Sequence, residues 1–129
     1  MIMPSIRVLG NPFPEDFKLE LAKQMSVDLK RILRVPHCDV FYQEFDEIYT
    51  NVREFKIRRV NDEDGSVTLL INGPPRDEEV LQELCETLTS DFRNLINYPK
   101  FDVIMVYHIV ESHCIGTNGR IHSLRGKRR

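Results

Sequence analysis

The hydrophobic and polar positions of this chain follow one pattern twice. Residues 5–45 and residues 68–108 align without a gap, 63 positions apart, and apolar residues and chain breakers coincide along most of that length. Few residues are identical, but the shared pattern predicts two copies of one supersecondary unit. The identical pairs include Gly10 and Gly73, Asp28 and Asp91, and Pro36 and Pro99.

The first copy predicts a strand, a helix and a second strand. Ser5–Leu9 is the first strand, and the Gly/Pro-rich residues 10–14 end it. Apolar residues at helical spacing follow, with acidic residues in the first turn and basic residues in the last, as the helix dipole favours. Pro36 ends this helix, and Val40–Ile48 follows as a strand. The apolar helix face consists of Phe17, Leu21, Ala22, Met25, Leu29, Ile32 and Leu33.

The second copy predicts the same order of elements. Val67–Ile71 is a strand, and residues 72–75 (Asn-Gly-Pro-Pro) break the chain before a helix with an acidic first turn. Tyr98-Pro99 ends this helix, and Phe101–Val110 is the last strand. The apolar helix face consists of Val80, Leu84, Cys85, Leu88, Phe92 and Leu95.

Two further segments lie outside this repeated pattern. Val52–Val60 is rich in strand-forming residues but heavily charged, and residues 61–65 predict a turn, so we expect an exposed hairpin arm. Residues 116–119 predict another turn, and a basic segment follows it. We therefore predict a single domain, residues 1–129, made of copy one at about 4–50, the arm at 51–66, copy two at about 67–119 and a basic tail at 120–129.

This order of elements predicts an α+β fold with a four-stranded sheet. Two β-α-β units with right-handed crossovers place both helices on one face of the sheet. The last strand is apolar on both faces at Val103–Tyr107, so its second face also needs a cover. The chain offers no third helix for that purpose. We therefore expect this face to pack against other subunits.

The composition says more about the cellular location and the partners of this protein than about its chemistry. The 129-residue chain is 41% hydrophobic and 29% charged, and its net charge of −2 predicts no general attraction to nucleic acid or membrane. Cys38, Cys85 and Cys114 are an odd number of cysteines without a CxxC pair, which suits a reduced, cytoplasmic location. No apolar stretch reaches the length of a membrane helix, and we recognise no signal peptide. The basic tail is most simply a solvated terminus, with a nucleic-acid contact or an address signal as the alternative.

Few residue groups suggest a metal or a cofactor. His37-Cys38 and His113-Cys114 are adjacent residues, which point to opposite faces on a strand, whereas zinc motifs bring their ligands together. The sequence contains no Walker loop, GxGxxG motif or serine elbow. We therefore expect neither a metal nor another cofactor.

These features together resemble the tautomerase superfamily, the group of 4-oxalocrotonate tautomerase and macrophage migration inhibitory factor. The similarity covers roughly residues 3–119 and is carried by Met3-Pro4 at the head of a strand and by residues 72–76, Asn-Gly-Pro-Pro-Arg. Within this group the chain looks most like a family of short tautomerase-like proteins of unknown function. The resemblance implies duplicated β-α-β units, a homotrimer, and an amino-terminal proline as the catalyst.

Pro4 is the catalytic residue that this resemblance implies. If translation starts at Met3 and that methionine is removed, Pro4 has a free secondary amine with a pKa of about 8. A neutral amine can move a proton at a carbon next to a carbonyl, and burial or nearby cations would keep it neutral. If translation starts at Met1, the same nitrogen is a peptide nitrogen and this chemistry is lost. The alternative interpretation is a proline at the start of an edge strand, where the missing N–H costs nothing.

The resemblance also implies that cations hold a substrate carboxylate. Arg76, at the start of the second helix, is the first candidate, since a helix N-terminus also favours anions. Arg34, just after the first helix, and Tyr107, on the last strand, correspond in position to pocket residues of some relatives. Each has a structural alternative: a surface ion pair for Arg76, a charge that complements the helix dipole for Arg34, and a core or interface aromatic for Tyr107.

The predicted function is isomerase-like chemistry on a small oxo-acid that carries a carboxylate, with Pro4 as the base. We expect a homotrimer with pockets near Pro4 at the subunit edges, and no membrane or nucleic-acid partner. The alternative is a non-catalytic interaction module that binds a ligand or RNA, because the order βαββαβ also describes the ferredoxin-like fold. RNA-binding sheets of that kind expose stacking aromatics, whereas the last strand here has the composition of a buried strand.

Overall fold

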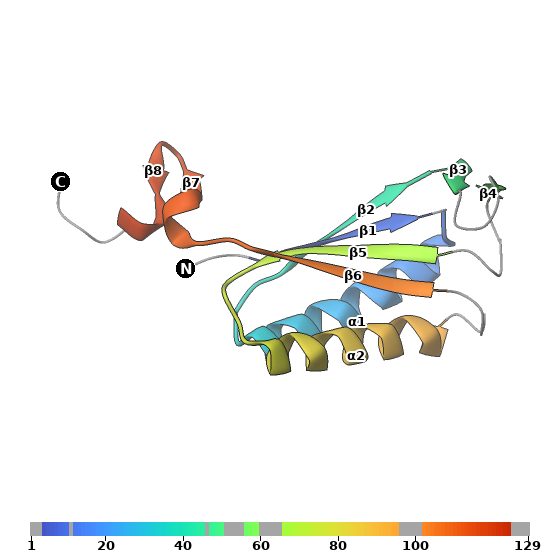
Figure 1. Cartoon of the computed structure of the whole chain (residues 1–129), viewed down its shortest axis with the longest axis horizontal. Coiled ribbons are helices and arrows are strands. Elements are labelled where there is room, and N and C mark those ends of the chain that lie inside the picture. Colours follow the sequence, from blue (N-terminus) through green and yellow to red (C-terminus); the bar gives the residue numbers. More distant parts are fainter. Residues whose placement is uncertain are drawn as a thin grey trace.

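The computed structural model describes residues 4–10, 12–45, 47–50, 56–59, 66–95 and 102–124. It contains two long helices, a four-stranded sheet and two small hairpins (Figure 1). The main elements are β1 (Ser5–Gly10), α1 (Glu15–Leu33), β2 (Asp39–Glu44), β5 (Ser66–Gly73), α2 (Glu78–Leu95) and β6 (Asp102–Ile109). The smaller elements are β3 (Glu47–Thr50), β4 (Lys56–Arg59), β7 (Gly116–Thr117), β8 (Arg120–Ile121) and the 3₁₀ turns η1 (Ser112–Cys114) and η2 (His122–Leu124).

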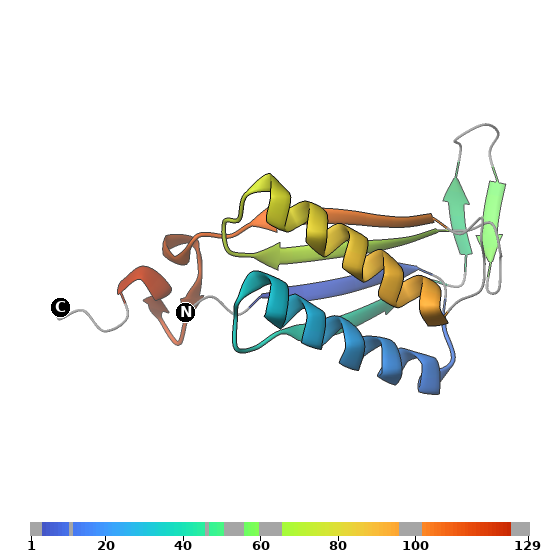
Figure 2. The same cartoon turned by 90° about the horizontal axis from the view of Figure 1, so that it is seen from below.

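The main sheet has the strand order β2-β1-β5-β6. The outer pairs β1–β2 and β5–β6 are parallel, and the central pair β1–β5 is antiparallel. Both helices lie on one face of this sheet, as the two views show (Figures 1 and 2). The predicted α+β fold of two β-α-β units with a hairpin arm is therefore confirmed.

The central strand pair relates the two units by an approximate two-fold axis. Arg7 on β1 pairs with Leu70 on β5, which is the residue 63 positions later. The helices that follow these two strands run antiparallel to each other across the sheet (Figure 2). Equivalent residues that lie close to this axis can therefore contact each other, as Arg7 and Leu70 do in the sheet.

The core lies between the sheet and the two helices. Its buried side chains alternate along β1 and β5 and recur at helical spacing along α1 and α2. Of the predicted helix faces, Leu95 does not belong to the core, since it is 39% exposed. Phe13, Phe17 and Phe92 pack together at one end, with ring centroids 5.1 to 6.0 Å apart. The buried apolar residues are Ile6, Val8, Leu21, Met25, Leu29, Ile32, Leu33, Val67, Leu69, Ile71, Leu84, Leu88 and Phe92.

The opposite face of the sheet carries exposed apolar side chains. Val40 and Tyr42 of β2 pack on the core, so Phe41 between them points away from the helices and is 53% exposed. On β6, Ile104 and Val106 alternate in the same way and are 45% and 38% exposed. We refer to Phe41, Ile104 and Val106 as the open face.

One predicted strand is divided in the structure. The sequence predicts a single strand over Val40–Ile48, but β2 ends at Glu44 and β3 begins at Glu47. The reason is that β1 ends at Gly10, whose carbonyl accepts the last bond from the Phe45 N–H (2.8 Å), so β2 has no neighbouring strand among the described residues beyond this point. The chain then turns to pair β3 with β4, and the hairpin arm starts before residue 51.

Residues 120–124, the first part of the predicted basic tail, form a short strand and a 3₁₀ turn. Arg120 belongs to β8 and donates two hydrogen bonds to the Leu124 carbonyl (3.0 and 2.6 Å). Asn118 and Gly119 have φ angles of 53° and 82°, and they form the turn expected over residues 116–119. Several features of the sequence analysis lie outside the described residues: Met1–Met3, the arm residues 51–55, residue 60 with the turn at 61–65, Tyr98-Pro99 with Phe101, and the end of the basic tail at 125–129.

Candidate active site

Four chain segments meet at one end of the sheet. Ser5 pairs with Asn72, so the residue before β1, Pro4, and the last residue of β5, Gly73, lie at the same end. Because each helix runs back along its strands, α1 ends and α2 begins here too (Figure 2). The candidate residues Pro4, Arg34, Arg76 and Tyr107 all belong to this end of the molecule.

Arg34 terminates α1 with an exposed cation. Its backbone is left-handed (φ 56°, ψ 52°), and the following Val35 N–H returns to the Lys30 carbonyl at 3.1 Å. This geometry is a common helix C-cap. Within the described part of the chain, the Arg34 side chain makes no hydrogen bond or ion pair. Its charge both complements the helix dipole and stays available to an anion.

Arg76 joins the end of α1 to the start of α2. Its Nε and Nη2 atoms donate to the Leu33 carbonyl at 3.2 and 2.6 Å, and its Nη1 donates to the Pro75 carbonyl at 2.7 Å. A carbonyl at a helix C-terminus has no partner within the helix, so this cation satisfies it. Three of the five guanidinium N–H groups are used in this way, and two remain for a ligand.

Tyr107 fixes the turn between β5 and α2. Its hydroxyl donates to the Pro74 carbonyl at 2.6 Å. A Cβ atom on Gly73 would approach the Tyr107 hydroxyl too closely and would lie 3.0 Å from Cζ, so a larger residue here would displace the Tyr107 side chain. Burial raises the pKa of Tyr107 to about 12, although the nearby Arg76 charge acts in the opposite direction. The phenol therefore stays protonated and keeps its hydrogen bond at neutral pH.

Pro4 is buried at the head of β1. Its carbonyl accepts a hydrogen bond from the Asp39 N–H at 3.2 Å, which begins the β1–β2 pairing. Extending the β1–β5 register by one residue places Pro4 opposite Gly73, the residue beneath the Tyr107 ring. Pro4 and Tyr107 are thus close to the same point of the β5–α2 turn.

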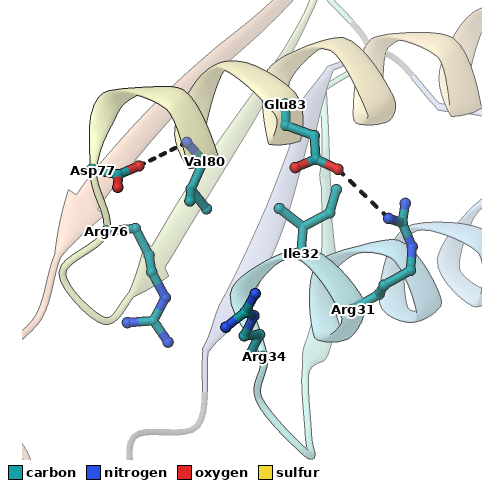
Figure 3. Close-up of a pocket in the computed structure, with 7 residues that line it drawn as sticks. All are labelled: Arg31, Ile32, Arg34, Arg76, Asp77, Val80 and Glu83. Carbon is teal, nitrogen blue, oxygen red and sulfur yellow. Dashed lines mark hydrogen bonds and ion pairs between the residues drawn. The ribbon is translucent and has the colours of Figure 1, made fainter.

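A hollow of about 690 Å³ lies between the end of α1 and the start of α2 (Figure 3). Arg34 and Arg76 enter it from the two sides, and Ile32 and Val80 form its apolar part. Pro4 and Tyr107 do not line this hollow. The full lining is Arg31, Ile32, Arg34, Arg76, Asp77, Val80 and Glu83.

Both acidic side chains of the hollow already have partners, whereas some of its cationic groups have none in the part of the chain that the structure describes. Asp77 accepts the Val80 N–H at 3.0 Å and so caps α2, while Glu83 lies 3.6 Å from Arg31 (Figure 3). The side chain of Arg34 and the two remaining N–H groups of Arg76 have no such acidic partner among the described residues. This arrangement can hold a small carboxylate.

The other sequence candidates give no second site. Burial raises the pKa of the Cys38 thiol to about 11, so it is a poor nucleophile and metal ligand at neutral pH. Among the residues that the structure describes, no three His, Cys, Asp or Glu side chains are grouped to hold a metal ion. Neither described helix is long and apolar enough to cross a membrane.

No family model and no curated protein matches the sequence, but solved structures match the fold. A fused 4-OT protein, solved as a symmetric trimer, has a TM-score of 0.68 and 15% identity, and the match covers 96% of this chain and 99% of that one. The chain has the tautomerase fold. The resemblance inferred from the sequence is therefore confirmed at the level of architecture.

Two further structures share this tautomerase fold. Pt0534, solved after inactivation by 2-oxo-3-pentynoate, has a TM-score of 0.71 and 15% identity, with 96% of this chain and 99% of that one covered. A domain of unknown function (DUF1904) from Sebaldella termitidis has a TM-score of 0.68 and 17% identity, with 92% and 99% covered. These identities are low, so the matches establish the fold and not the activity.

The sequence analysis missed one group of functional interest, an acidic pair between the helices. Asp28 and Asp91 are the described polar residues that are buried. The available signal was their position: two aligned, identical aspartates, one in each helix. A charged residue that is buried needs a partner, so such a coincidence predicts contact.

Proposed function

We propose that this protein catalyses tautomerase-like proton transfer on a small oxo-acid, with the Pro4 nitrogen as general base when Pro4 is the first residue. The observation that carries the proposal is the location of Pro4 at the end of a tautomerase fold where Arg34, Arg76 and Tyr107 also lie. In this arrangement a base and two cations face the same end of the sheet. That is what a carboxylate-bearing substrate requires.

The proposed reaction needs a neutral amine. A free α-amino group has a pKa of about 8, and the burial of Pro4 favours its neutral form. The lone pair of the Pro4 nitrogen takes a proton from a carbon next to the carbonyl, and the C–H electron pair moves into an enolate. The protonated amine then returns the proton to another atom of the substrate, which completes an isomerisation.

Arg34 and Arg76 are proposed to bind the substrate carboxylate in the hollow. Arg76 is held by the Leu33 and Pro75 carbonyls, so its two remaining N–H groups have a fixed direction. Arg34 is exposed and supplies a second charge. Since Pro4 does not line the hollow, the reacting carbon would lie at its rim. Tyr107 positions the β5–α2 turn through the Pro74 carbonyl and does not itself transfer a proton.

We further propose that the protein assembles as a homotrimer through the open face. Phe41, Ile104 and Val106 leave an apolar surface exposed on a single chain, and burying such a surface between subunits is favourable. A matching fused 4-OT protein is described as a trimer. Assembly through this face would place the Pro4 ends of the subunits near subunit edges.

The experiment that tests the catalytic proposal is covalent labelling with 2-oxo-3-pentynoate, the compound that inactivates Pt0534. A free Pro4 amine should add to the triple bond, with one N–C bond formed and the amine proton transferred to the neighbouring carbon. Peptide mass spectrometry of a chain that begins at Pro4 should locate one label on Pro4. A chain that keeps Met1–Met3 has an amide nitrogen there and should stay unlabelled at Pro4. Labelling confined to the exposed Cys114 would contradict the proposal.

A further inference from the structure

A buried pair of acidic side chains lies between the two helices. Asp28 on α1 and Asp91 on α2 are each 7% exposed, and their carboxyl groups are hydrogen-bonded to each other. They are equivalent residues of the two units, 63 positions apart, and their contact places them near the approximate two-fold axis that relates Arg7 to Leu70. Two carboxylates can share a hydrogen bond only if one of them carries a proton.

The surroundings of the two aspartates differ, and this decides which one is charged. Asp28 accepts hydrogen bonds from Gln24 Nε2 at 3.2 Å and from Arg31 Nη2 at 3.3 Å. The positions that correspond to Gln24 and Arg31 in α2 are Thr87 and Asn94. Asp91 Oδ2 is buried and has no hydrogen-bond partner among the described residues. Asp28 is therefore the anion, and Asp91 keeps the proton.

Few other described charges act on this pair. From α1, Arg31 faces both carboxyl groups, and from α2, Glu83 lies 3.6 Å from the same Arg31. The core side chains on the sheet side of the helices, such as Met25 and Leu88, are apolar and buried. Arg31 and Glu83 also line the hollow at the helix ends. Arg31 therefore contacts Asp28 of the acidic pair and also lines the hollow of the candidate site.

The direction of the titration follows from these contacts. Burial first, and then the hydrogen bond and charge of Asp28, raise the pKa of Asp91 to about 7. Burial opposes the ionisation of Asp28, but hydrogen bonds with Asp91, Gln24 and Arg31 outweigh it and lower its pKa. An unfolded aspartate has a pKa of about 3.9. The stability that depends on protonated Asp91 is therefore full below that pH and is lost as the pH rises through 7.

We propose that Asp28 and Asp91 form a one-proton acid pair that holds α1 against α2, and that loss of this proton loosens the helix pair and the hollow beside it. The device depends on two carboxyls meeting where equivalent residues of the two β-α-β units come together. It is independent of Pro4 and of any activity. A purely structural acidic pair, both ionised or solvated, would show no such pH dependence.

The test is urea unfolding of the full chain between pH 5 and pH 8, at one protein concentration, for the wild type and the Asp91→Asn variant. Asparagine keeps the shape of a protonated aspartate and can still donate to Asp28. We expect the folding equilibrium constant of the wild type to fall at least tenfold more over this range than that of Asp91→Asn. The matched control is Glu20→Gln, which removes an exposed carboxylate from α1 and should retain the wild-type slope.

A direct readout uses the wild type alone, so that a misfolded variant cannot obscure the answer. Carboxyl carbon NMR should show an aspartate that titrates near pH 7 and a second aspartate that responds at the same pH. Amide hydrogen exchange in α1 and α2 should become faster above that pH. Aspartate titrations that all end below about pH 5, or equal slopes for the wild type and Asp91→Asn, would overturn the proposal.

Discussion

Arg76 donates two hydrogen bonds to the carbonyl oxygen of Leu33, the last residue of α1. The two residues are 43 positions apart, and their contact ties the end of one helix to the start of the other. The same guanidinium lines the hollow that we propose for a substrate carboxylate. Arg76 therefore has a structural contact and a proposed binding role, and variants can separate the two.

Arg76→Ala should lower the free energy of unfolding by about 1.5–3 kcal/mol, because hydrogen bonds from a charged donor to a helix-end carbonyl are lost. Arg34→Ala should change it by less than about 0.5 kcal/mol, since the Arg34 side chain is exposed and contacts no described partner. Denaturant unfolding of both variants measures the difference. Equal destabilisation by the two substitutions would refute a capping role for Arg76.

Gly73→Ala should destabilise the protein by about 1–3 kcal/mol, because the new methyl group collides with the Tyr107 ring and hydroxyl. Gly10→Ala is the matched control, since Gly10 is the aligned residue of the first unit and its Cβ would meet Val67 Cγ2 at an ordinary 3.4 Å. Thermal unfolding of both variants is the measurement. The combination Gly73→Ala with Tyr107→Phe should recover part of the loss, because the closest atom, the hydroxyl oxygen, is removed.

Val106→Lys should break the proposed trimer by placing a charge on the open face, while each chain stays folded. Leu19→Lys is the matched control, because Leu19 is a 59% exposed apolar residue on α1, away from that face. Sedimentation at one concentration should show trimers for the wild type and the control and monomers for Val106→Lys. A monomeric wild type, or a trimeric Val106→Lys variant, would be incompatible with assembly through this face.

Much of the fold could be predicted because it depends on local periodicity. The helical spacing of apolar residues located α1 and α2, and the mostly apolar run Val67–Ile71 before the Asn-Gly-Pro-Pro break located β5. The end of β2 could not be found in this way. It depends on where β1 stops at Gly10, and strand pairing is a long-range property.

The shared location of the candidate site residues could be predicted from the topology, but their contacts could not. The topology of two β-α-β units brings Pro4, Arg34, Arg76 and Tyr107 to one end of the sheet. The residues named from the family resemblance therefore lie at the same end of the molecule. The bond from Arg76 to Leu33 depends on how two helices pack, which periodicity does not specify. The shared proton of Asp28 and Asp91 depends on burial and on the Gln24 and Arg31 donors, which the aligned residues alone do not reveal.

The most direct test of the proposed function is the turnover of phenylenolpyruvate by a chain that begins at Pro4, compared with its Pro4→Ala variant. Alanine keeps a free amino terminus and a folded sheet but replaces the secondary amine at the head of β1. We expect turnover by the Pro4 chain and a loss of at least about 100-fold in the variant, the usual size of a general-base contribution. Equal turnover by the two chains would contradict Pro4 as the base.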